Sequence, residues 1–342
     1  MTKGEMDARL QANKAAAADS LRSPTLSRRK DQDDARLDDA ARAGWLYYIA
    51  GNTQDEIAAK LGISRQTAQR LVALAVSERL VKVRLEHPIA VCLDLAARLK
   101  ERFGFAFAEV TPTDPASEST TLGVAEAAAA EIERQLRAPE PKIIAIGTGR
   151  TLKAAIELLP PIEASEKKIV SLTGNIAPDG SAAIYSVIFT MADVVKARHF
   201  PMTLPVIATS AEERDLLHSQ AMIRGTLALA ARADIAFVGI GDLGANAPLY
   251  QDGFVTQAEL TALQRAGAIG EITGWAFDKE GQLIEGLTND RVASAPLPIV
   301  SKCLVVAIAM GSRKLAGIAA AVKGRLINGL ITDEQTAERL LV

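Results

Sequence analysis

The stretch Lys142-Ile-Ile-Ala-Ile-Gly-Thr-Gly-Arg-Thr151 joins a short apolar run to a glycine turn, and then to a helical pattern that continues to Leu159. Similar β-rich runs recur at 168–172, 206–208, 235–240, 304–308 and 330–331. Helical patterns alternate with them at 91–102, 212–232, 312–322 and 333–341. The β-rich runs are continuously apolar, which is typical of strands covered on both faces. The sequence therefore predicts an α/β fold class for residues 89–342, with a doubly wound, mostly parallel sheet.

A mostly helical segment precedes this domain. Thr53-Gln-Asp-Glu56 has the spacing of a capping box, Gly62 makes a turn, and Ser64 caps the next helix. The preceding helix is expected to bury an apolar face of Trp45, Leu46, Tyr48 and Ile49. The alternating run 80–85 reads as a strand. We therefore predict a winged helix-turn-helix over residues 37–88, after a flexible arm over residues 1–36.

Charge is concentrated in the predicted helix-turn-helix. The whole chain has 39 Lys and Arg against 41 Asp and Glu, a net charge of −2, so no global field attracts it to nucleic acid. Between Ile57 and Arg84, however, Glu78 is the one acid among six basic residues: Lys60, Arg65, Arg70, Arg79, Lys82 and Arg84. Such a local excess suits a phosphate backbone.

The helix that begins after Ser64 is the expected DNA-recognition helix. Arginine bridges guanine and glutamine bridges adenine in the major groove, so its polar face has suitable base readers. The predicted DNA-binding residues are Ser64, Arg65, Gln66, Thr67, Gln69 and Arg70, with Lys82 and Arg84 on the DNA backbone. The alternative is a three-helix packing module with a solvated polar face.

Several classes of protein are disfavoured by composition. Two cysteines, Cys92 and Cys303, and three histidines provide neither a disulfide framework nor a zinc site, and we expect no metal and no cofactor. The longest apolar runs, such as Cys303 to Met310, are shorter than the roughly 18 residues of a spanning helix. The N-terminus has no apolar signal-peptide region. We expect a cytoplasmic protein with no membrane partner.

Ordered motifs over about 290 residues resemble the SorC family of bacterial transcriptional regulators. The first is Tyr48-Ile-Ala-Gly-Asn-Thr-Gln-Asp-Glu-Ile-Ala-Ala-Lys-Leu-Gly-Ile-Ser-Arg-Gln-Thr-Ala-Gln-Arg-Leu71, in which Ala68 replaces a frequent valine. The others are 146–152, Val238-Gly-Ile-Gly241, Gly267-Ala-Ile-Gly-Glu-Ile272 and 327–337. The resemblance implies a winged helix-turn-helix joined to a sugar-binding domain related to glucosamine-phosphate deaminases, ribose-phosphate isomerases and CoA transferases. It also implies a homo-oligomer, a dimer or tetramer, that responds to sugars or phosphosugars.

Ligands of parallel α/β sheets bind outside the carboxyl ends of the strands. The loop 147–151 lies at such an end, where backbone N–H groups and a helix dipole favour an anion. We expect ligand contacts from Gly147, Thr148, Gly149, Arg150, Thr151, Thr173, Gly174, Asn175, Gly241 and Asp242. Asp242 is equally well explained as a turn or cap residue. The resemblance adds Lys314, which matches a ligand-contacting lysine of the family and is otherwise a surface lysine; it leaves the roles of Asp278 and Arg291 open.

Two functions remain to be compared. The sequence predicts a DNA-binding regulator, a repressor or activator, of a carbohydrate or polyol catabolic operon, with operator DNA and a sugar, sugar phosphate or polyol effector as partners. The alternative is a sugar-phosphate isomerase or deaminase fused to a helix-turn-helix. The segment 242–248 contains no histidine and one acid, whereas the related enzymes place a histidine or paired acids after this loop. We therefore expect no catalytic residues and no enzymatic turnover.

Overall fold

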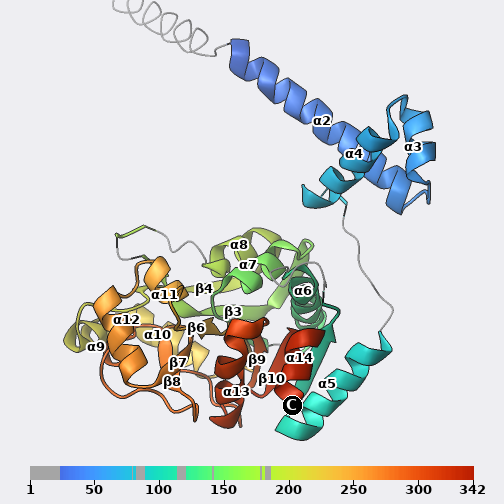
Figure 1. The fold of residues 1–342 in the computed structure, drawn as a ribbon. Coiled ribbons are helices and arrows are strands. Elements are labelled where there is room, and N and C mark those ends of the chain that lie inside the picture. The colour runs from blue at the N-terminus through green and yellow to red at the C-terminus, as the bar shows by residue number, and fades with distance from the viewer. Residues whose placement is uncertain are drawn as a thin grey trace, which may run out of the picture. The chain divides into compact units, whose positions relative to one another are not determined.

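The computed structural model describes residues 24–78, 80–81, 89–113, 121–140, 142–177, 179–181 and 186–342, with side chains from residue 35 onward. The chain divides into two compact units, Met1–Glu86 and His87–Val342, which we describe separately (Figure 1). The predicted wing at 80–85, including Lys82 and Arg84, lies almost wholly outside the described residues, as does His87. No helix of the described chain is long and apolar enough to cross a membrane.

The N-terminal unit is built from three described helices, α2 (Pro24–Tyr48), α3 (Gln54–Leu61) and α4 (Arg65–Ser77). Their small core consists of Ala43, Ile57, Ala68 and Val72. Helix α2 begins at Pro24, inside the stretch predicted as an arm, and proline is well suited to a first helical position because its φ is already fixed.

The buried face of α2 differs from the predicted one. Trp45 is 56% exposed and Ile49 is 68% exposed, and Tyr48 is exposed as well, so the prediction was wrong at these three positions, whereas Leu46 is half-buried and packs against the small core. Ala40 and Ala43 are fully buried instead. A face lined by the small residues Ala40, Ala43 and Gly44 lets α4 approach α2 closely, and a Cβ on Gly44 would lie 2.7 Å from Ala75 Cβ. Trp45 lies about 200° around the helix from Ala43, so it points away from this face.

A seven-stranded sheet organises the C-terminal unit, in the order β1-β10-β9-β5-β2-β3-β4, and every neighbouring pair is parallel. The strands in that order are Phe107–Thr111, Gly329–Asp333, Leu304–Ile308, Ile235–Gly239, Lys142–Ile146, Ile162–Ile176 and Val195–Pro205. On β2 Ala145 packs toward one face, while Ile144 and Ile146 pack toward the other.

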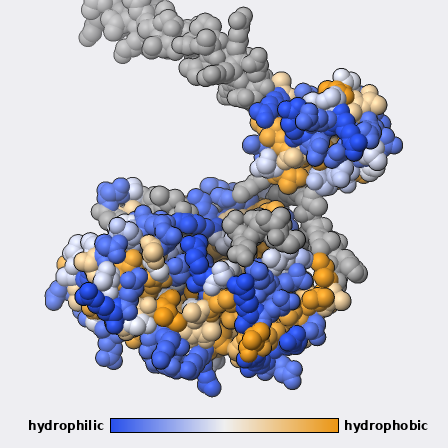
Figure 2. Space-filling view, viewed as in Figure 1, coloured by the Kyte–Doolittle hydropathy of each residue, from blue (hydrophilic) through white to orange (hydrophobic). Residues whose placement is uncertain are grey.

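Helices cover both faces of this sheet, which confirms the predicted doubly wound α/β fold (Figure 1). The core on one side includes residues of α5 (Ala90–Phe103), α10 (Ala221–Ala230), α13 (Leu315–Lys323) and α14 (Glu334–Leu341). The core on the other includes residues of α6 (Leu122–Arg137), α7 (Arg150–Glu157) and α8 (Val187–Val194). The visible surface is mostly hydrophilic, with apolar side chains gathered near α5 and α14 (Figure 2).

A second, smaller sheet was not predicted. Strands β6 (Gly241–Asp242), β7 (Ala268–Ile272) and β8 (Trp275–Asp278) are antiparallel to one another. Helices α11 (Pro248–Gln251) and α12 (Gln257–Arg265) belong to the same region. These elements share a small core of their own, which includes Leu243, Leu260 and Ala276. The segment therefore forms a separate packed layer beside the carboxyl end of β5.

Some element boundaries differ from the predicted ones. Residues 206–208 form no strand beyond a single bridge between Ile207 and Val292. The predicted helix 212–232 is divided at Gln220 into α9 (Ala211–Ser219) and α10, because Gln220 has an extended backbone. The predicted helix 312–322 begins with a short 3-10 turn, η2 (Ser312–Lys314), before α13.

Candidate functional site

Hydrogen bonds of both predicted caps fix the starts of α3 and α4. The backbone N–H of Thr53 donates to Glu56 Oε2 at 2.8 Å, and the Glu56 N–H donates to Thr53 Oγ1 at 3.3 Å. The Thr53 N–H also lowers the pKa of Glu56. Gly62 has the φ of +66° that suits glycine, and Ser64 Oγ accepts from the Thr67 N–H at 3.1 Å. The predicted helix-turn-helix geometry is confirmed at these positions.

Helix α4 presents a polar face to solvent. Arg65, Gln66, Gln69 and Arg70 are exposed, while Thr67 is half-buried. Arg65 Nε lies 3.5 Å from Asp55 Oδ1, with both side chains 69% exposed. Such an exposed pair adds little stability, so exchanging it for a nucleic acid contact costs little. The exposed side chains of α4 are therefore accessible to a partner outside the chain.

A large cavity of about 1010 Å³ lies at the carboxyl ends of the parallel strands in the C-terminal unit. The strands β9, β5, β2 and β3 are neighbours in the sheet, so their ends meet at this edge. Eight of the predicted ligand residues line the cavity: Thr148, Gly149, Arg150, Thr151, Thr173, Gly174, Gly241 and Asp242. Lys314 lines it too, from the end of η2 after β9. Loops far apart in the sequence thus surround one space.

Gly147 and Asn175, also expected in the site, do not line this cavity. Gly147 donates its N–H to the Phe237 carbonyl at 2.8 Å, and a Cβ there would lie 3.2 Å from Thr273 Cγ2. Asn175 is buried, and its Nδ2 donates to Ser186 Oγ at 2.7 Å. Both residues therefore have packing or hydrogen-bonding roles in the structure.

The loop after β2 leads directly into α7. Gly149 has a φ of +138°, which favours glycine, and its position precedes the first helical residue, Arg150. A Cβ on Gly239, at the end of β5, would lie 2.8 Å from the Thr148 carbonyl oxygen. Glycines at both strand ends therefore let the two loops approach each other beside the cavity.

Charged groups of both signs line the cavity. Burial lowers the pKa of Lys314, against the opposing effect of Glu271 and Asp242. Burial raises the pKa of Glu271, although the Gly274 N–H donates to its Oε2 at 2.8 Å and Lys314 is nearby. Burial also raises the pKa of Asp252, and Arg150 acts in the opposite direction. A ligand in this cavity meets donors and acceptors that are partly withdrawn from water.

Asp242 has a role within the protein as well. Its Oδ1 accepts from the Gly244 N–H at 3.2 Å, as expected of a turn residue, and it also lines the cavity. Both interpretations of Asp242 are therefore compatible with its position.

Most of the cavity residues were not singled out from the sequence, and Glu271 and Thr273 are two of them. Glu271 and Thr273 come from β7 and from the turn after it, and both line the cavity. Glu271 lies in the stretch Gly267–Ile272, which is one of the motifs that resemble the SorC family. Because the small sheet was not predicted, the sequence did not indicate that Glu271 reaches the carboxyl ends of the parallel strands.

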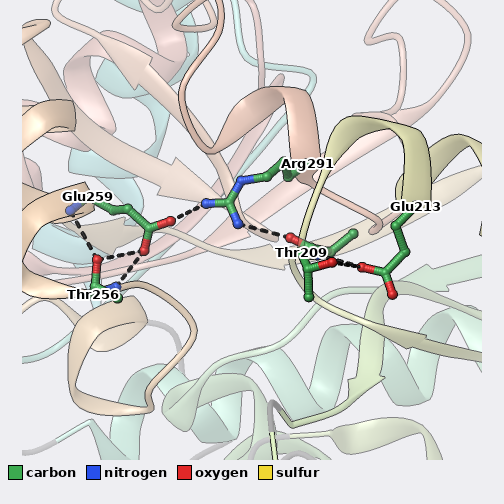
Figure 3. Close-up of polar contacts among 6 residues, drawn as sticks. Thr209, Glu213, Thr256, Glu259 and Arg291 are labelled. Atoms are coloured by element: carbon green, nitrogen blue, oxygen red, sulfur yellow. Dashed lines mark hydrogen bonds and ion pairs between the residues drawn. The ribbon is translucent and has the colours of Figure 1, made fainter.

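Asp278 and Arg291, whose roles were open, have structural partners outside the cavity lining. Asp278 Oδ1 accepts from the Gln282 N–H at 2.9 Å. Arg291 Nη1 donates to the Ala208 carbonyl at 3.0 Å, and its Nη2 pairs with Glu259 at the start of α12 (Figure 3). Arg291 thus ties α12 to the loop after β4 and helps to hold the segment whose residues 246–254 contribute to one wall.

The described residues bring no histidine into the cavity lining. His199 Nδ1 contacts the Ala197 carbonyl on β4, and His218 Nε2 contacts the Ala293 carbonyl. Across the described ranges, no group of three or more His, Cys, Asp or Glu side chains has metal-binding geometry.

Comparisons with known proteins identify the family to which most of the chain is similar. The Sugar-bind family model, described as "Putative sugar-binding domain", matches residues 87–342. The erythritol catabolism regulatory protein EryD of Brucella abortus (strain 2308) is 32% identical over 311 residues, which cover 91% of this chain and 98% of that protein. The transcriptional regulator LsrR of Enterobacter sp. (strain 638) is 29% identical over 316 residues, covering 88% and 92% of the two chains.

A solved structure agrees with these relatives. The full-length sorbitol operon regulator SorC from Klebsiella pneumoniae superposes with a TM-score of 0.67 at 27% identity, covering 89% of this chain and 98% of that one. The match to the family model and the likeness to EryD over nearly its full length confirm the resemblance drawn from the motifs. The chain belongs to the Sugar-bind family of SorC-like transcriptional regulators.

Proposed function

We propose that the protein is a DNA-binding regulator of a carbohydrate or polyol catabolic operon, controlled by a small effector in the C-terminal cavity. One observation carries the proposal: neighbouring strand ends of the large sheet bring Arg150, Lys314 and Asp242 to one cavity, which Glu271 joins from the small sheet, in a chain that also contains a helix-turn-helix. The names of EryD and SorC, which refer to erythritol catabolism and a sorbitol operon, support a polyol or sugar as the effector class.

The cavity lining suits a polyhydroxylated molecule with or without an anionic group. The loop 147–151, with Arg150 and the start of α7, is our proposed anion position, because backbone N–H groups and a cation favour negative charge there. Lys314 donates hydrogen bonds, and Asp242 and Glu271 accept them from ligand hydroxyls. The combination recognises a sugar, a polyol or one of their phosphates.

In the N-terminal unit, α4 is the proposed reader of operator DNA. Arg65, Gln66 and Gln69 contact base edges, and Lys82 and Arg84, from the predicted wing, contact phosphates. An effector changes operator affinity only if it binds the DNA-competent and incompetent forms with different affinities. Such a regulator works in the cytoplasm, where its operator is located.

We further infer that the functional form is a homo-oligomer, a dimer or a tetramer. A single helix-turn-helix makes too few contacts for tight operator binding, and paired modules read paired half-sites. Light scattering with and without operator DNA tests this, and a monomer under both conditions at micromolar concentration contradicts it.

A ligand screen tests the effector proposal and the enzyme alternative together. Thermal melts with sugars, polyols and their monophosphates are expected to identify a stabilising compound, since a ligand at about 100 times its Kd adds about 2.7 kcal/mol. The same compound is expected to change operator affinity in a gel-shift titration and to remain chemically unchanged by NMR. Formation of a product would favour an isomerase or deaminase, and the absence of any stabilising compound would contradict the effector site.

A further inference from the structure

The turn between β7 and β8 has an unusual backbone. It consists of only Thr273 and Gly274, and both have positive φ, +52° and +95°. Two-residue hairpin turns of this kind normally carry Asn-Gly or Asp-Gly, because a β-branched residue is disfavoured at positive φ. Strained residues of this type concentrate at functional sites. Thr273 also lines the cavity.

A second threonine-glycine pair occupies the same wall of the cavity. Thr173 and Gly174, near the end of β3, both line it. A Cβ on Gly174 would overlap the Pro205 carbonyl, and a Cβ on Gly274 would lie 3.2 Å from Val206 Cγ1. The two glycines therefore rest on consecutive residues of one segment, and this segment brings Thr173 and Thr273 to one side of the cavity.

The hydroxyl groups of these threonines share a further property. Thr173 is 4% exposed and Thr273 is 3% exposed, and neither Oγ1 has a hydrogen-bond partner among the described residues. Buried polar groups in proteins are nearly always hydrogen-bonded, so two unpartnered hydroxyls on one cavity wall indicate a partner from outside the chain. Rotation about χ1 moves a threonine hydroxyl between staggered positions, and such a rotation is how either Oγ1 would turn toward a ligand in the cavity that both residues line.

We propose that Thr173 and Thr273 form a hydroxyl-recognition pair, whose side chains hydrogen-bond to hydroxyl groups of a polyhydroxylated effector. The inference rests on the proposed function: it gives a specificity-determining role to Thr173, already an expected ligand residue, and adds Thr273. A hydroxyl group both donates and accepts, so the pair matches the hydroxyls of a sugar or polyol, whereas a phosphate accepts hydrogen bonds and suits the Arg150 loop better. The two threonines are thus assigned to the hydroxyls and the 147–151 loop to the anion.

Calorimetric titrations of variants test this pair. The probes are erythritol, sorbitol, their monophosphates and inorganic phosphate, and the variants are Thr173→Val, Thr273→Val and Thr273→Ser. Each valine variant is expected to weaken the best-binding polyol or polyol phosphate by about 3- to 10-fold, the effect of one neutral hydrogen bond. Thr273→Ser keeps the hydroxyl and is expected to stay within about twofold of wild type. The affinity for inorganic phosphate is expected to be unchanged in all three.

Thr226→Val is the matched control. Thr226 is also buried, but it lies on α10 outside the cavity lining, and its Oγ1 donates to the Met222 carbonyl at 3.4 Å. This variant is expected to bind every probe as wild type does. Melting temperatures of the ligand-free proteins separate folding from recognition, since replacing an unpartnered hydroxyl by a methyl group is expected not to lower stability.

Each outcome decides the proposal. Wild-type affinity in both valine variants, or an equal loss for inorganic phosphate, overturns the hydroxyl-recognition pair while leaving the effector proposal standing. If Thr273→Val is too poorly folded to measure, Thr173→Val decides: wild-type affinity in this variant then overturns the pair. If the wild-type protein binds none of the organic probes, the effector proposal fails, and this inference fails with it.

Discussion

The Glu271 side chain lies directly against the backbone of Gly241. The two residues are paired between β7 and β6, and any Cβ at position 241 would overlap the Glu271 carboxylate. Glycine at 241 is therefore what allows this carboxylate to reach the cavity wall, where Lys314 and Asp242 interact with its charge. The arrangement explains the Gly-Ile-Gly stretch after β5 by a close approach rather than by turn geometry.

Gly241→Ala is accordingly expected to displace Glu271 and to weaken effector binding by about ten- to a hundredfold, the effect of losing one hydrogen bond to a charged group. Overpacking is expected to cost a further 1–3 kcal/mol or so of stability. Gly225→Ala is the matched control, because a Cβ there, on α10, meets nothing within 4 Å. Calorimetry showing equal ligand affinity in the two variants would contradict the role of Gly241.

The buried position of Glu271 also predicts a pH dependence. Burial raises its pKa above the usual 4.5, so the folded protein retains a proton that the unfolded chain releases. Stability is therefore lost as pH rises from about 4.5 toward the folded pKa, by about 1.4 kcal/mol for each pH unit that separates the pKa values of the unfolded and folded states. Glu271→Gln removes this titration. Urea unfolding from pH 4 to 8 is expected to show the variant gaining stability relative to wild type as pH rises, and a constant difference would exclude a raised pKa.

In the N-terminal unit, Arg65→Ala is expected to weaken specific operator binding by about 1–3 kcal/mol and to relax the preference at one base pair. Asp55→Asn is the informative companion: it removes the charge 3.5 Å from Arg65 and leaves the arginine in place. We expect it to preserve or strengthen operator affinity. Gel-shift titrations against operator variants measure both effects. An unchanged base preference in Arg65→Ala would remove this residue from base recognition.

Five of the seven strands of the large sheet were predictable, because each contains a continuously apolar run; β1 and β4 were missed, since apolar and polar residues are mixed along both. Continuous runs such as Ile235–Gly239 and Leu304–Ile308 need no tertiary information to be recognised. The small sheet gave no such signal, since β6 has only two residues and the chain around it reads as a loop. Trp45 illustrates a different failure: hydropathy indicates that a side chain is apolar but not which face of its helix packs against a neighbour.

The cavity residues show the same contrast between the large sheet, most of which was predictable, and the small sheet, which was not. Residues that directly follow predicted strands, such as Arg150 and Asp242, were found because strand ends meet at one edge of a parallel sheet. Glu271 and Thr273 were missed because they reach this edge from the small antiparallel sheet. The unusual φ of Thr273 and the missing partner of its hydroxyl are properties of three-dimensional packing, and neither is encoded in a local pattern.

The last prediction separates effector sensing from folding and DNA binding. Arg150 is exposed at the start of α7, lines the cavity and interacts with the charge of Asp252 across it. Arg150→Ala is expected to leave operator binding of the ligand-free protein nearly unchanged and to weaken the effector. The loss is about 1.5–3 kcal/mol for a phosphorylated ligand, through a charge-assisted contact, and about 0.5–1.5 kcal/mol for an uncharged polyol.

The size of the loss in effector affinity therefore identifies the ligand class. A loss of about ten- to a hundredfold indicates a phosphorylated ligand, and a loss of less than about tenfold indicates an uncharged polyol. Arg232→Ala is the matched control, because Arg232 is exposed after α10 and lies outside the cavity lining. Thermal melts of both variants are expected to stay close to wild type, since exposed arginines contribute little to stability. If calorimetry gives Arg150→Ala the affinity of wild type for the effector, the 147–151 loop is not the anion position, and the ligand is held by Lys314, Asp242 and Glu271 instead.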